Sequence, residues 1–331
     1  MSALTLELPT VERQVDVSGF LAEAVNGLSQ PQKMLPCKFL YDEEGSRLFD
    51  RICTLEEYYP TRTETRILRD NIEQIARLIG RDCRLIEFGS GTSAKTRHLL
   101  THLSQPVSYV PIDISGECLR ESCAQLASEF PNLEIQPLVA DFNAQFDLPC
   151  PARREKRSVA FFPGSTIGNF EREDVVCFLR NVASVCGRRG GLLIGFDLKK
   201  DKDVIEPAYN DRRGVTAQFN LNILARANRE LGADFDLASF RHHAPYVERL
   251  GRIEMHLIST RPQTVRLGEF EFWFEAGEYI TTEHSYKYGL PEFSRLAQSA
   301  GFDLVKTWTD RKDWFAVQFL AVHDKSVFKL D

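Results

Sequence analysis

The chain has 331 residues and a formal net charge of −6, from 41 Lys and Arg against 47 Asp and Glu. Hydrophobic residues make up 43% of it and charged residues 27%, as in ordinary globular proteins. The densest basic stretch, RREKR at 153–157, is too short for a nucleic-acid or membrane surface. The N-terminus has no signal-peptide pattern, and no apolar run approaches the roughly 20 residues that cross a bilayer. We therefore expect a cytoplasmic protein that binds neither nucleic acid nor membrane. We also expect a monomer, although nothing in the composition determines the oligomeric state.

The eight cysteines are scattered along the chain and include no Cys-x-x-Cys pair. His98 and His102 lie four residues apart on an expected helix, but the sequence offers no third ligand near them. We interpret these two histidines as surface residues and expect no metal site.

The first helix with recognisable ends is expected at 61–80. Thr61 and Glu64 have the spacing of a capping box, and Gly80 is a typical stop. The apolar residues between these ends form one stripe, made of Leu68, Ile72, Ile75 and Ile79. Such a stripe predicts a helix with one buried face.

Strand-like and helix-like segments alternate from residue 84 onward. Five strands are expected, at 84–88, 107–114, 133–142, 158–163 and 191–198. Helical segments follow the first, second and fourth of them, which indicates βαβ units and a parallel sheet. Two further strands, at 302–310 and 314–324, predict a C-terminal β-hairpin at the sheet edge. The fold class is therefore α/β with a Rossmann-like sheet.

Residues 200–288 have a different pattern. A helical stretch at 209–235 precedes three segments with the alternation of antiparallel strands, at 252–260, 263–267 and 270–288. We expect a second, α+β domain built from 1–62 and 200–288. The sheet domain then consists of 63–199 and 289–331.

The stretch IEFGSGTSAK at 86–95 joins the first expected strand to the helix after it, where open α/β sheets bind ligands. Gly89, Gly91 and Ala94 match the dinucleotide pattern G-x-G-x-x-A, so an NAD site must be considered. Glu87 argues against NAD, because a carboxylate is a poor neighbour for a pyrophosphate. It suits the cationic S-adenosylmethionine better, and the carboxylate of that cofactor could lie beside Lys95 at the helix N-terminus.

Two further acids follow the next strands. Asp113 lies 24 residues beyond Gly89, where a carboxylate can accept hydrogen bonds from ribose hydroxyls. Asp141 could accept from an adenine amino group while Phe142 packs on the ring. Each acid could instead cap a helix. Acids at or near the ends of three successive strands favour one ligand lying across them.

The loop GSTIGNF at 164–170 follows the fourth expected strand. Its glycines allow a close backbone approach, and its hydroxyl and amide groups can hydrogen-bond a ligand. A tight turn would explain the glycines equally well, so the loop alone leaves both interpretations open.

Six stretches together resemble the histidine-specific N-alpha-methyltransferases of ergothioneine biosynthesis. They are FLYDEEGSRLFDRICTLEEYYPTRTE, EFGSGTSAKT, GSTIGNF, AYNDRRGVTAQFN, RIEMHL and TTEHSYKY. The resemblance covers nearly the whole chain in the same order. It implies a class I methyltransferase domain with a substrate domain, and an enzyme that uses S-adenosyl-L-methionine to trimethylate the amine of L-histidine, giving hercynine.

The resemblance also implies the roles of individual residues. Asn169 and Tyr58 would orient the substrate amine and are the catalytic candidates, Tyr41 and Tyr209 would hold its carboxylate, and Glu283 with Ser285 would face the imidazole. The cofactor would lie against Glu87, Gly89, Ser90, Gly91, Lys95, Asp113, Asp141 and Phe142. No general base stands out, so solvent is expected to take the proton.

Alternative functions remain open at this point. A relative from ergot-alkaloid biosynthesis methylates a prenylated tryptophan amine, but Glu283 favours histidine, because a carboxylate gains little from an unsubstituted indole ring. An NAD-dependent dehydrogenase is the alternative of a different class, and a non-catalytic binding module is a third. His284, between the two imidazole candidates, could shift the substrate preference or point away.

Overall fold

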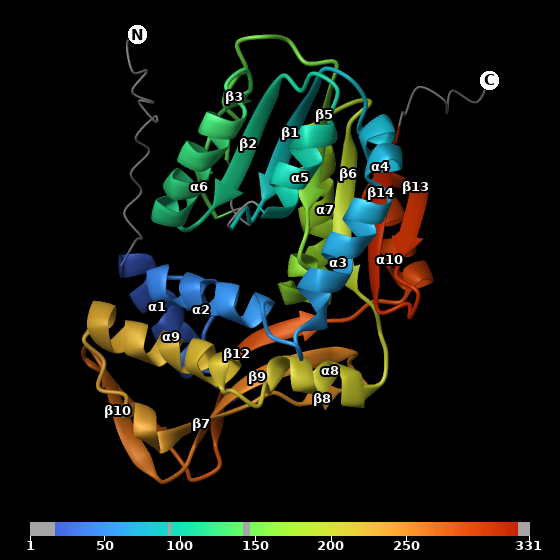
Figure 1. Cartoon of the computed structure of the whole chain (residues 1–331). Helices are drawn as coiled ribbons and strands as arrows, with labels where there is room; N and C mark the ends of the chain where they lie inside the picture. The colour runs from blue at the N-terminus through green and yellow to red at the C-terminus, as the bar shows by residue number, and fades with distance from the viewer. Residues whose placement is uncertain (1–16, 92–93, 142–145, 324–331) are drawn as a thin grey trace, which may run out of the picture.

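The computed structural model describes residues 17–91, 94–141 and 146–323. Its larger sheet has the strand order β13-β14-β6-β5-β1-β2-β3, with β4 beside β2 (Figure 1). The strands are β1 (Cys83–Phe88), β2 (Ser108–Asp113), β3 (Glu134–Ile135), β4 (Leu138–Val139), β5 (Arg157–Phe162), β6 (Gly191–Asp197), β13 (Phe302–Thr309) and β14 (Phe315–Val322). All pairs among β1 to β6 are parallel, whereas β14 is antiparallel to both β6 and β13. The predicted Rossmann-like sheet with a C-terminal hairpin is confirmed.

Helices cover both faces of this sheet because successive strand side chains point to opposite sides. In β1, Leu85 packs in one core with α3 and α4, and Ile86 packs in the other with α7 and α10. The helices of this part are α3 (Tyr59–Asp70), α4 (Ile72–Ile79), α5 (Ala94–His102), α6 (Gly116–Glu129), α7 (Arg172–Cys186) and α10 (Leu290–Ser299).

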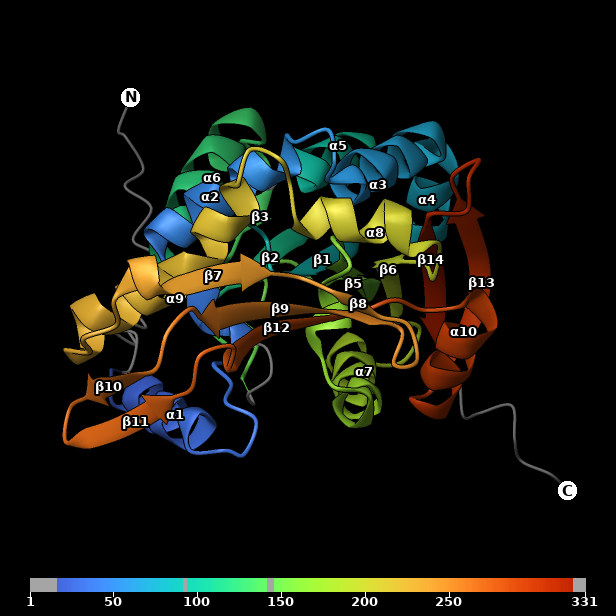
Figure 2. The same ribbon diagram turned by 90° about the horizontal axis from the view of Figure 1, so that it is seen from below.

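A second body lies below the carboxyl ends of the parallel strands in Figure 1. It contains a sheet of order β12-β9-β7 with β8 beside β9, and a separate β10–β11 ribbon. Figure 2 shows β9 and β12 crossing beneath the larger sheet. The strands are β7 (Phe240–His243), β8 (Tyr246–Val247), β9 (Arg252–Ser259), β10 (Gln263–Leu267), β11 (Phe270–Phe274) and β12 (Tyr279–Tyr286). The helices are α1 (Val17–Leu28), α2 (Glu43–Cys53), α8 (Lys202–Tyr209) and α9 (Val215–Leu231), with short 3-10 turns η1 (Cys37–Leu40) and η3 (Leu237–Ser239).

The N-terminal segment packs with residues from the middle of the chain. One hydrophobic core joins buried residues between 20 and 59 to others between 205 and 280. The backbone also connects the two, since Leu35 N donates to Thr281 O and Thr281 N donates to Lys33 O, both at 2.9 Å. These contacts favour the division that we propose, with 1–62 and 200–288 as one domain and 63–199 with 289–331 as the other.

Three local expectations need correction. The helix expected at 61–80 begins at Tyr59, with Pro60 in its first turn, and a break at Asn71 divides it into α3 and α4. The capping box is wrong because Glu64 turns inward and is fully buried. The strand expected at 133–142 is only the two short pieces β3 and β4.

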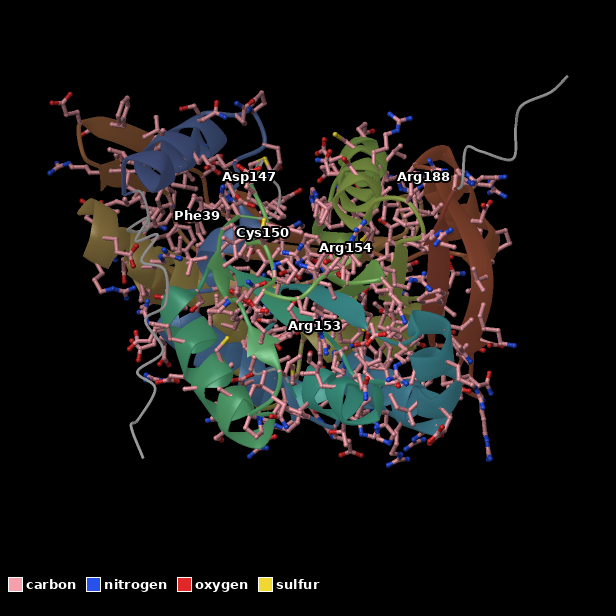
Figure 3. All side chains as sticks on the ribbon, turned by 90° about the horizontal axis from the view of Figure 1, so that it is seen from above. Phe39, Asp147, Cys150, Arg153, Arg154 and Arg188 are labelled. Carbon is pink, nitrogen blue, oxygen red and sulfur yellow. The ribbon has the colours of Figure 1, made fainter. Side chains whose placement is uncertain are left out.

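The basic stretch at 153–157 lies in the connection that leads into β5. Arg153 and Arg154 are exposed (Figure 3), whereas Lys156 forms an ion pair with Asp82 at 2.8 Å. Residues 153–156 are therefore part of a solvated loop, whereas Arg157 begins β5 and donates to Leu78 O and Gly190 O. No helix in the described part of the chain is long and apolar enough to span a membrane.

Candidate active site

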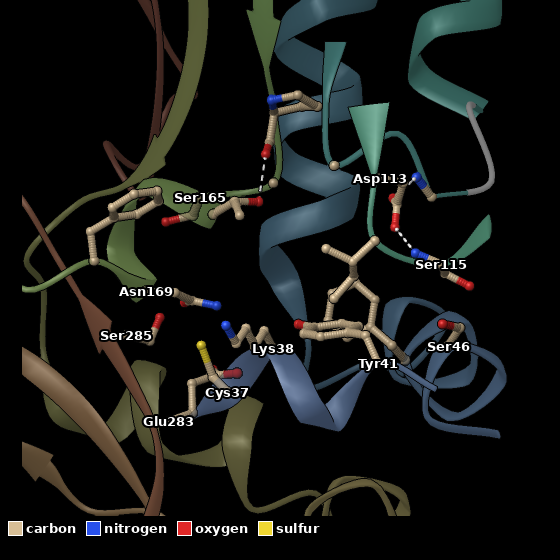
Figure 4. A pocket seen from close by; sticks show the side chains of 18 of the residues that line it. Cys37, Lys38, Tyr41, Ser46, Asp113, Ser115, Ser165, Asn169, Glu283 and Ser285 are labelled. Atoms are coloured by element: carbon tan, nitrogen blue, oxygen red, sulfur yellow. Dashed lines mark hydrogen bonds between the residues drawn. The ribbon is translucent and has the colours of Figure 1, made fainter. Parts of the chain in front are cut away.

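A cavity of about 1070 Å³ lies where the carboxyl ends of β1, β2, β4 and β5 face the second body. It brings together every candidate of the sequence analysis except Phe142, which lies outside the described residues. The candidates that border it are Tyr41, Tyr58, Glu87, Gly89, Ser90, Gly91, Lys95, Asp113, Asp141, Asn169, Tyr209, Glu283 and Ser285. In Figure 4, Asn169, Ser285 and Glu283 lie on one side of this cavity, and Asp113 lies on the other.

The glycine loop after β1 owes its shape to positive φ angles at Gly89 (72°) and Gly91 (46°), which glycine adopts without strain. Asp113 at the end of β2 holds this loop, because its carboxylate accepts from Gly91 N at 3.1 Å and from Ser115 N at 2.9 Å. Burial raises the pKa of Asp113, although these backbone N–H groups oppose the shift. Asp113 therefore fixes the loop and borders the cavity, and the capping interpretation is wrong for it, because the N-cap of α6 is Ser115 and α6 has no side-chain cap.

Glu87 lies at the base of the same loop and is buried. Its two carboxyl oxygens accept from the hydroxyls of Thr96 and Tyr109. Burial raises the pKa of Glu87 to about 8 in spite of these hydrogen bonds. A cation in the cavity would favour the ionised form, so this wall suits a positive ligand.

Lys95, in the first turn of α5, forms an ion pair with Glu64 of α3. The Glu64 carboxylate also accepts from Gly164 N, at 2.9 Å and 3.1 Å to its two oxygens. It packs so closely against β6 that a Cβ at Gly195 would lie 1.8 Å from it. The sequence analysis expected Lys95 beside the cofactor carboxylate and missed its partner. The buried Glu64 links α3, the Lys95 wall and the 164–170 loop.

Asp141 follows β4 and forms an ion pair with Lys38 of η1 at 3.2 Å. Lys38 also pairs with Glu23 of α1 at 2.9 Å. This bridge therefore connects the second body to the sheet at the cavity wall.

The 164–170 loop forms part of the cavity wall and is also a tight turn. Gly164 and Ser165 have positive φ angles of 83° and 62°, and the chain then forms the 3-10 turn η2 (Thr166–Asn169). A Cβ on Gly168 would lie 2.7 Å from Tyr286 O, so glycine allows the loop to pack on β12. This packing leaves Asn169 bordering the cavity close to the end that carries Ser285 (Figure 4).

Three tyrosines from different segments form an aromatic wall. The rings of Tyr58 and Tyr209 are 6.1 Å apart and edge-on, while Tyr41 packs edge-on against Phe49 and Phe219. Burial raises the pKa of all three phenols. Their hydroxyls therefore stay neutral near pH 7 and can donate hydrogen bonds.

Glu283 and Ser285 lie two residues apart in β12 and border the cavity together, as their spacing predicts. Burial raises the pKa of Glu283 to about 7, against the opposing charge of Lys287. His284, between them, is bound to Glu171 at the start of α7. That contact ties β12 to the segment that carries Asn169.

A buried polar cluster behind Ser285 was missed by the sequence analysis. Lys287 donates to Ser285 Oγ at 3.0 Å and to Tyr209 OH at 2.8 Å, and it pairs with Asp197 at 3.0 Å. Burial alone would raise the pKa of Asp197, but Lys287 and Lys200 hold it below its ordinary value. The sequence signal was a lysine directly after a buried strand and an aspartate at the end of the fifth strand.

Known proteins resemble the chain over most of its length. The family described as "Histidine-specific methyltransferase, SAM-dependent" matches residues 20–322. A histidine N-alpha-methyltransferase of Mycolicibacterium smegmatis is 41% identical over 290 residues, which are 86% of this chain and 89% of that protein. One from Mycobacterium tuberculosis is 39% identical over 305 residues, 90% of this chain and 94% of that protein. Ergothioneine biosynthesis protein 1 of Neurospora crassa is 34% identical over 307 residues, 90% of this chain but 34% of that protein.

Proposed function

We propose that this chain, which belongs to the S-adenosylmethionine-dependent, histidine-specific methyltransferase family, methylates the α-amino group of L-histidine in ergothioneine biosynthesis. We further propose that three methyl transfers give hercynine. The observation that carries the proposal is that one cavity is bordered by the loop after β1 and by Glu283 and Ser285 of β12. The family match spans both bodies that form this cavity, and the sheet is the class I methyltransferase fold.

The cavity wall at β1 fits S-adenosylmethionine. Ser90 Oγ is buried there with no hydrogen-bond partner among the described residues, so a polar ligand would satisfy it. We propose that Gly89 and Gly91 let the backbone approach the cofactor, while Asp113 and Glu87 favour its hydroxyl and cationic groups. Lys95 and Asp141, and Phe142 outside the described residues, complete the proposed set. When bound, the cofactor supplies a methyl group activated by a sulfonium.

The chain's own residues then hold the acceptor. We propose that Asn169 and Tyr58 hydrogen-bond the substrate amine, which must be neutral to accept a methyl group. Neutral partners orient it without stabilising the ammonium form, as a close carboxylate would. Because in-line methyl transfer needs alignment more than acid or base catalysis, these residues contribute through position. We propose that the released proton passes to solvent.

The rest of the histidine would be held by hydroxyls and one carboxylate. We propose that Tyr41 and Tyr209 lie beside the substrate carboxylate, where the neutral phenol of Tyr41 can donate to it, while the Tyr209 hydroxyl is hydrogen-bonded to Ser285 Oγ. Glu283 and Ser285 offer an acceptor and a hydroxyl to the two ring nitrogens. Leucine has no ring nitrogen and leaves the buried Glu283 unpaired, while tryptophan offers one N–H on a larger ring and no ring acceptor for a hydroxyl donor, which disfavours both.

The dehydrogenase alternative is wrong for a member of this S-adenosylmethionine-dependent family. Calorimetric titration with S-adenosylmethionine and separately with NAD tests the cofactor. We expect saturable binding of the first and none of the second, and the reverse would refute the proposal.

We also propose that the protein is a cytoplasmic monomer. Light scattering coupled to size-exclusion chromatography tests the oligomeric state, for which a mass near 37.8 kDa is expected. A mass near twice that value would contradict the proposal.

A further inference from the structure

Lys287 lies directly after β12 and is 0% exposed. Its ammonium group has three N–H donors and three acceptors around it. These are Asp197 Oδ2 at 3.0 Å, the Tyr209 hydroxyl oxygen at 2.8 Å and Ser285 Oγ at 3.0 Å. A lysine ammonium only donates hydrogen bonds, so both hydroxyl oxygens accept from it.

The two hydroxyls are also bonded to each other, with 2.9 Å between Tyr209 OH and Ser285 Oγ. The two hydroxyls carry one proton each, and one of these protons lies in their mutual hydrogen bond. The other proton has no acceptor within this cluster. Since Tyr209 and Ser285 both border the cavity, that proton is available only toward it. The pair therefore presents a donor, while its lone pairs are largely engaged.

We propose that Lys287 sets the hydrogen-bond polarity of the Tyr209–Ser285 pair, so that the site accepts neutral imidazole and rejects imidazolium. The inference rests on the proposed histidine methylation and deepens it. A neutral ring offers one bare nitrogen to the outward donor and one N–H to the Glu283 carboxylate. An imidazolium ring has two N–H groups, and one of them would face a donor. Lys287 is thus a positioning residue that acts through Ser285 and Tyr209.

The neighbouring lysine provides a matched control. Lys200 pairs with the same Asp197, at 2.6 Å, and contacts Tyr59 OH at 2.8 Å. Both lysines are buried and both neutralise Asp197, but only Lys287 reaches the site hydroxyls. The charged and titratable groups facing Lys287 are Asp197, Lys200, Tyr209, Tyr246 and Glu283.

The test compares L-histidine with L-3-(1,2,4-triazol-3-yl)alanine, whose ring has a similar shape but stays neutral between pH 5.5 and pH 7.5. The readout is kcat/KM for the triazole divided by kcat/KM for histidine. Titration of Glu283 or of the α-amine affects both substrates alike, whereas ring protonation affects histidine alone. At one pH unit below an imidazole pKa of about 6.5, only about a tenth of the histidine is neutral. In the wild type the ratio should therefore rise about tenfold as the pH is lowered from 7.5 to 5.5.

Lys287→Met should reduce this rise to less than about threefold, because Ser285 then regains a free lone pair to accept from imidazolium. Lys200→Met should keep the tenfold rise. A Lys287→Met variant that keeps the rise, or a Lys200→Met variant that loses it equally, would overturn the inference. If Lys287→Met fails to fold by circular dichroism, the double variant Tyr209→Phe/Ser285→Ala takes its place, since removing both hydroxyls removes the outward donor and should also flatten the ratio. If the wild type methylates histidine but the ratio of the two kcat/KM values does not change with pH, this inference alone is refuted. If the wild type does not methylate histidine, the proposed function is refuted.

Discussion

Glu64→Gln is a sharp perturbation because it removes one charge and preserves the shape of the side chain. The buried carboxylate serves two donors at once, Lys95 Nζ and Gly164 N. A glutamine has only one oxygen, and its NH₂ group would face the second donor. The side chain has no room to move away on the β6 side, because it packs directly on the backbone of Gly195. Even a Cβ added to that glycine would lie 1.8 Å from the carboxylate.

The magnitude follows from these contacts. Removing one partner of a buried pair costs about 3–5 kcal/mol. The Lys95 side chain is 17% exposed and borders the cavity, so its ammonium regains some hydration and the lower end applies. We expect a loss of about 3 kcal/mol, and at about 2 °C per kcal/mol for a chain of this size the melting temperature should fall by about 6 °C.

Thermal unfolding followed by fluorescence measures this loss, with Glu73→Gln on the exposed face of α4 as the control. Calorimetry with S-adenosylmethionine provides a second readout. Because Glu64 orients Lys95 at the cavity wall, affinity should fall about tenfold in Glu64→Gln and stay unchanged in the control. Melting within about 1 °C of the wild type would refute the assignment of Glu64 as a buried link.

Four further predictions concern the site. Asn169→Ala should lower turnover far more than cofactor affinity, and an equal loss of both would mean that the 164–170 loop serves the cofactor instead. Asp113→Ala removes charged hydrogen bonds to the loop and should weaken S-adenosylmethionine binding by about 1.5–3 kcal/mol, so an unchanged calorimetric affinity would contradict its role. Burial raises the pKa of Glu283 to about 7 from 4.5 in the unfolded chain, so the folded state binds more protons and stability falls as the pH rises through this window. The melting temperature of Glu283→Gln should therefore be close to that of the wild type at pH 5 and above it at pH 8, and a difference that is the same at both pH values would contradict the pKa shift. Glu283→Ala should raise KM for histidine about tenfold or more and have little effect on cofactor binding.

Much of the fold could be predicted because it depends on local patterns. The βαβ alternation and the C-terminal hairpin are read directly from apolar periodicity, and α7 is the helical segment expected after the fourth strand. Glu283 and Ser285 share a strand face because side chains alternate along β12. The remaining site residues came from the resemblance, and the cavity brings the described ones together.

What the sequence could not reveal are contacts between distant segments. Glu64 had the spacing of a capping residue, but its partners Lys95 and Gly164 are 31 and 100 residues away. Lys287 and Asp197 pair across 90 residues and across the two bodies, and neither has a local pattern that names its partner. Local propensity gave way to tertiary contacts in these cases, because a buried charge must find a counter-charge wherever the fold provides one.

Incubation of the purified protein with L-histidine and S-adenosylmethionine, followed by mass spectrometry with fragmentation, tests the central claim most directly. Tryptophan and leucine should be present as competitors in the same reaction. We predict that histidine gains three methyl groups, all on the α-amino nitrogen, while the competitors stay unmodified. Unchanged histidine, methyl groups on the ring nitrogens, or tryptophan or leucine methylated as fast as histidine would contradict it.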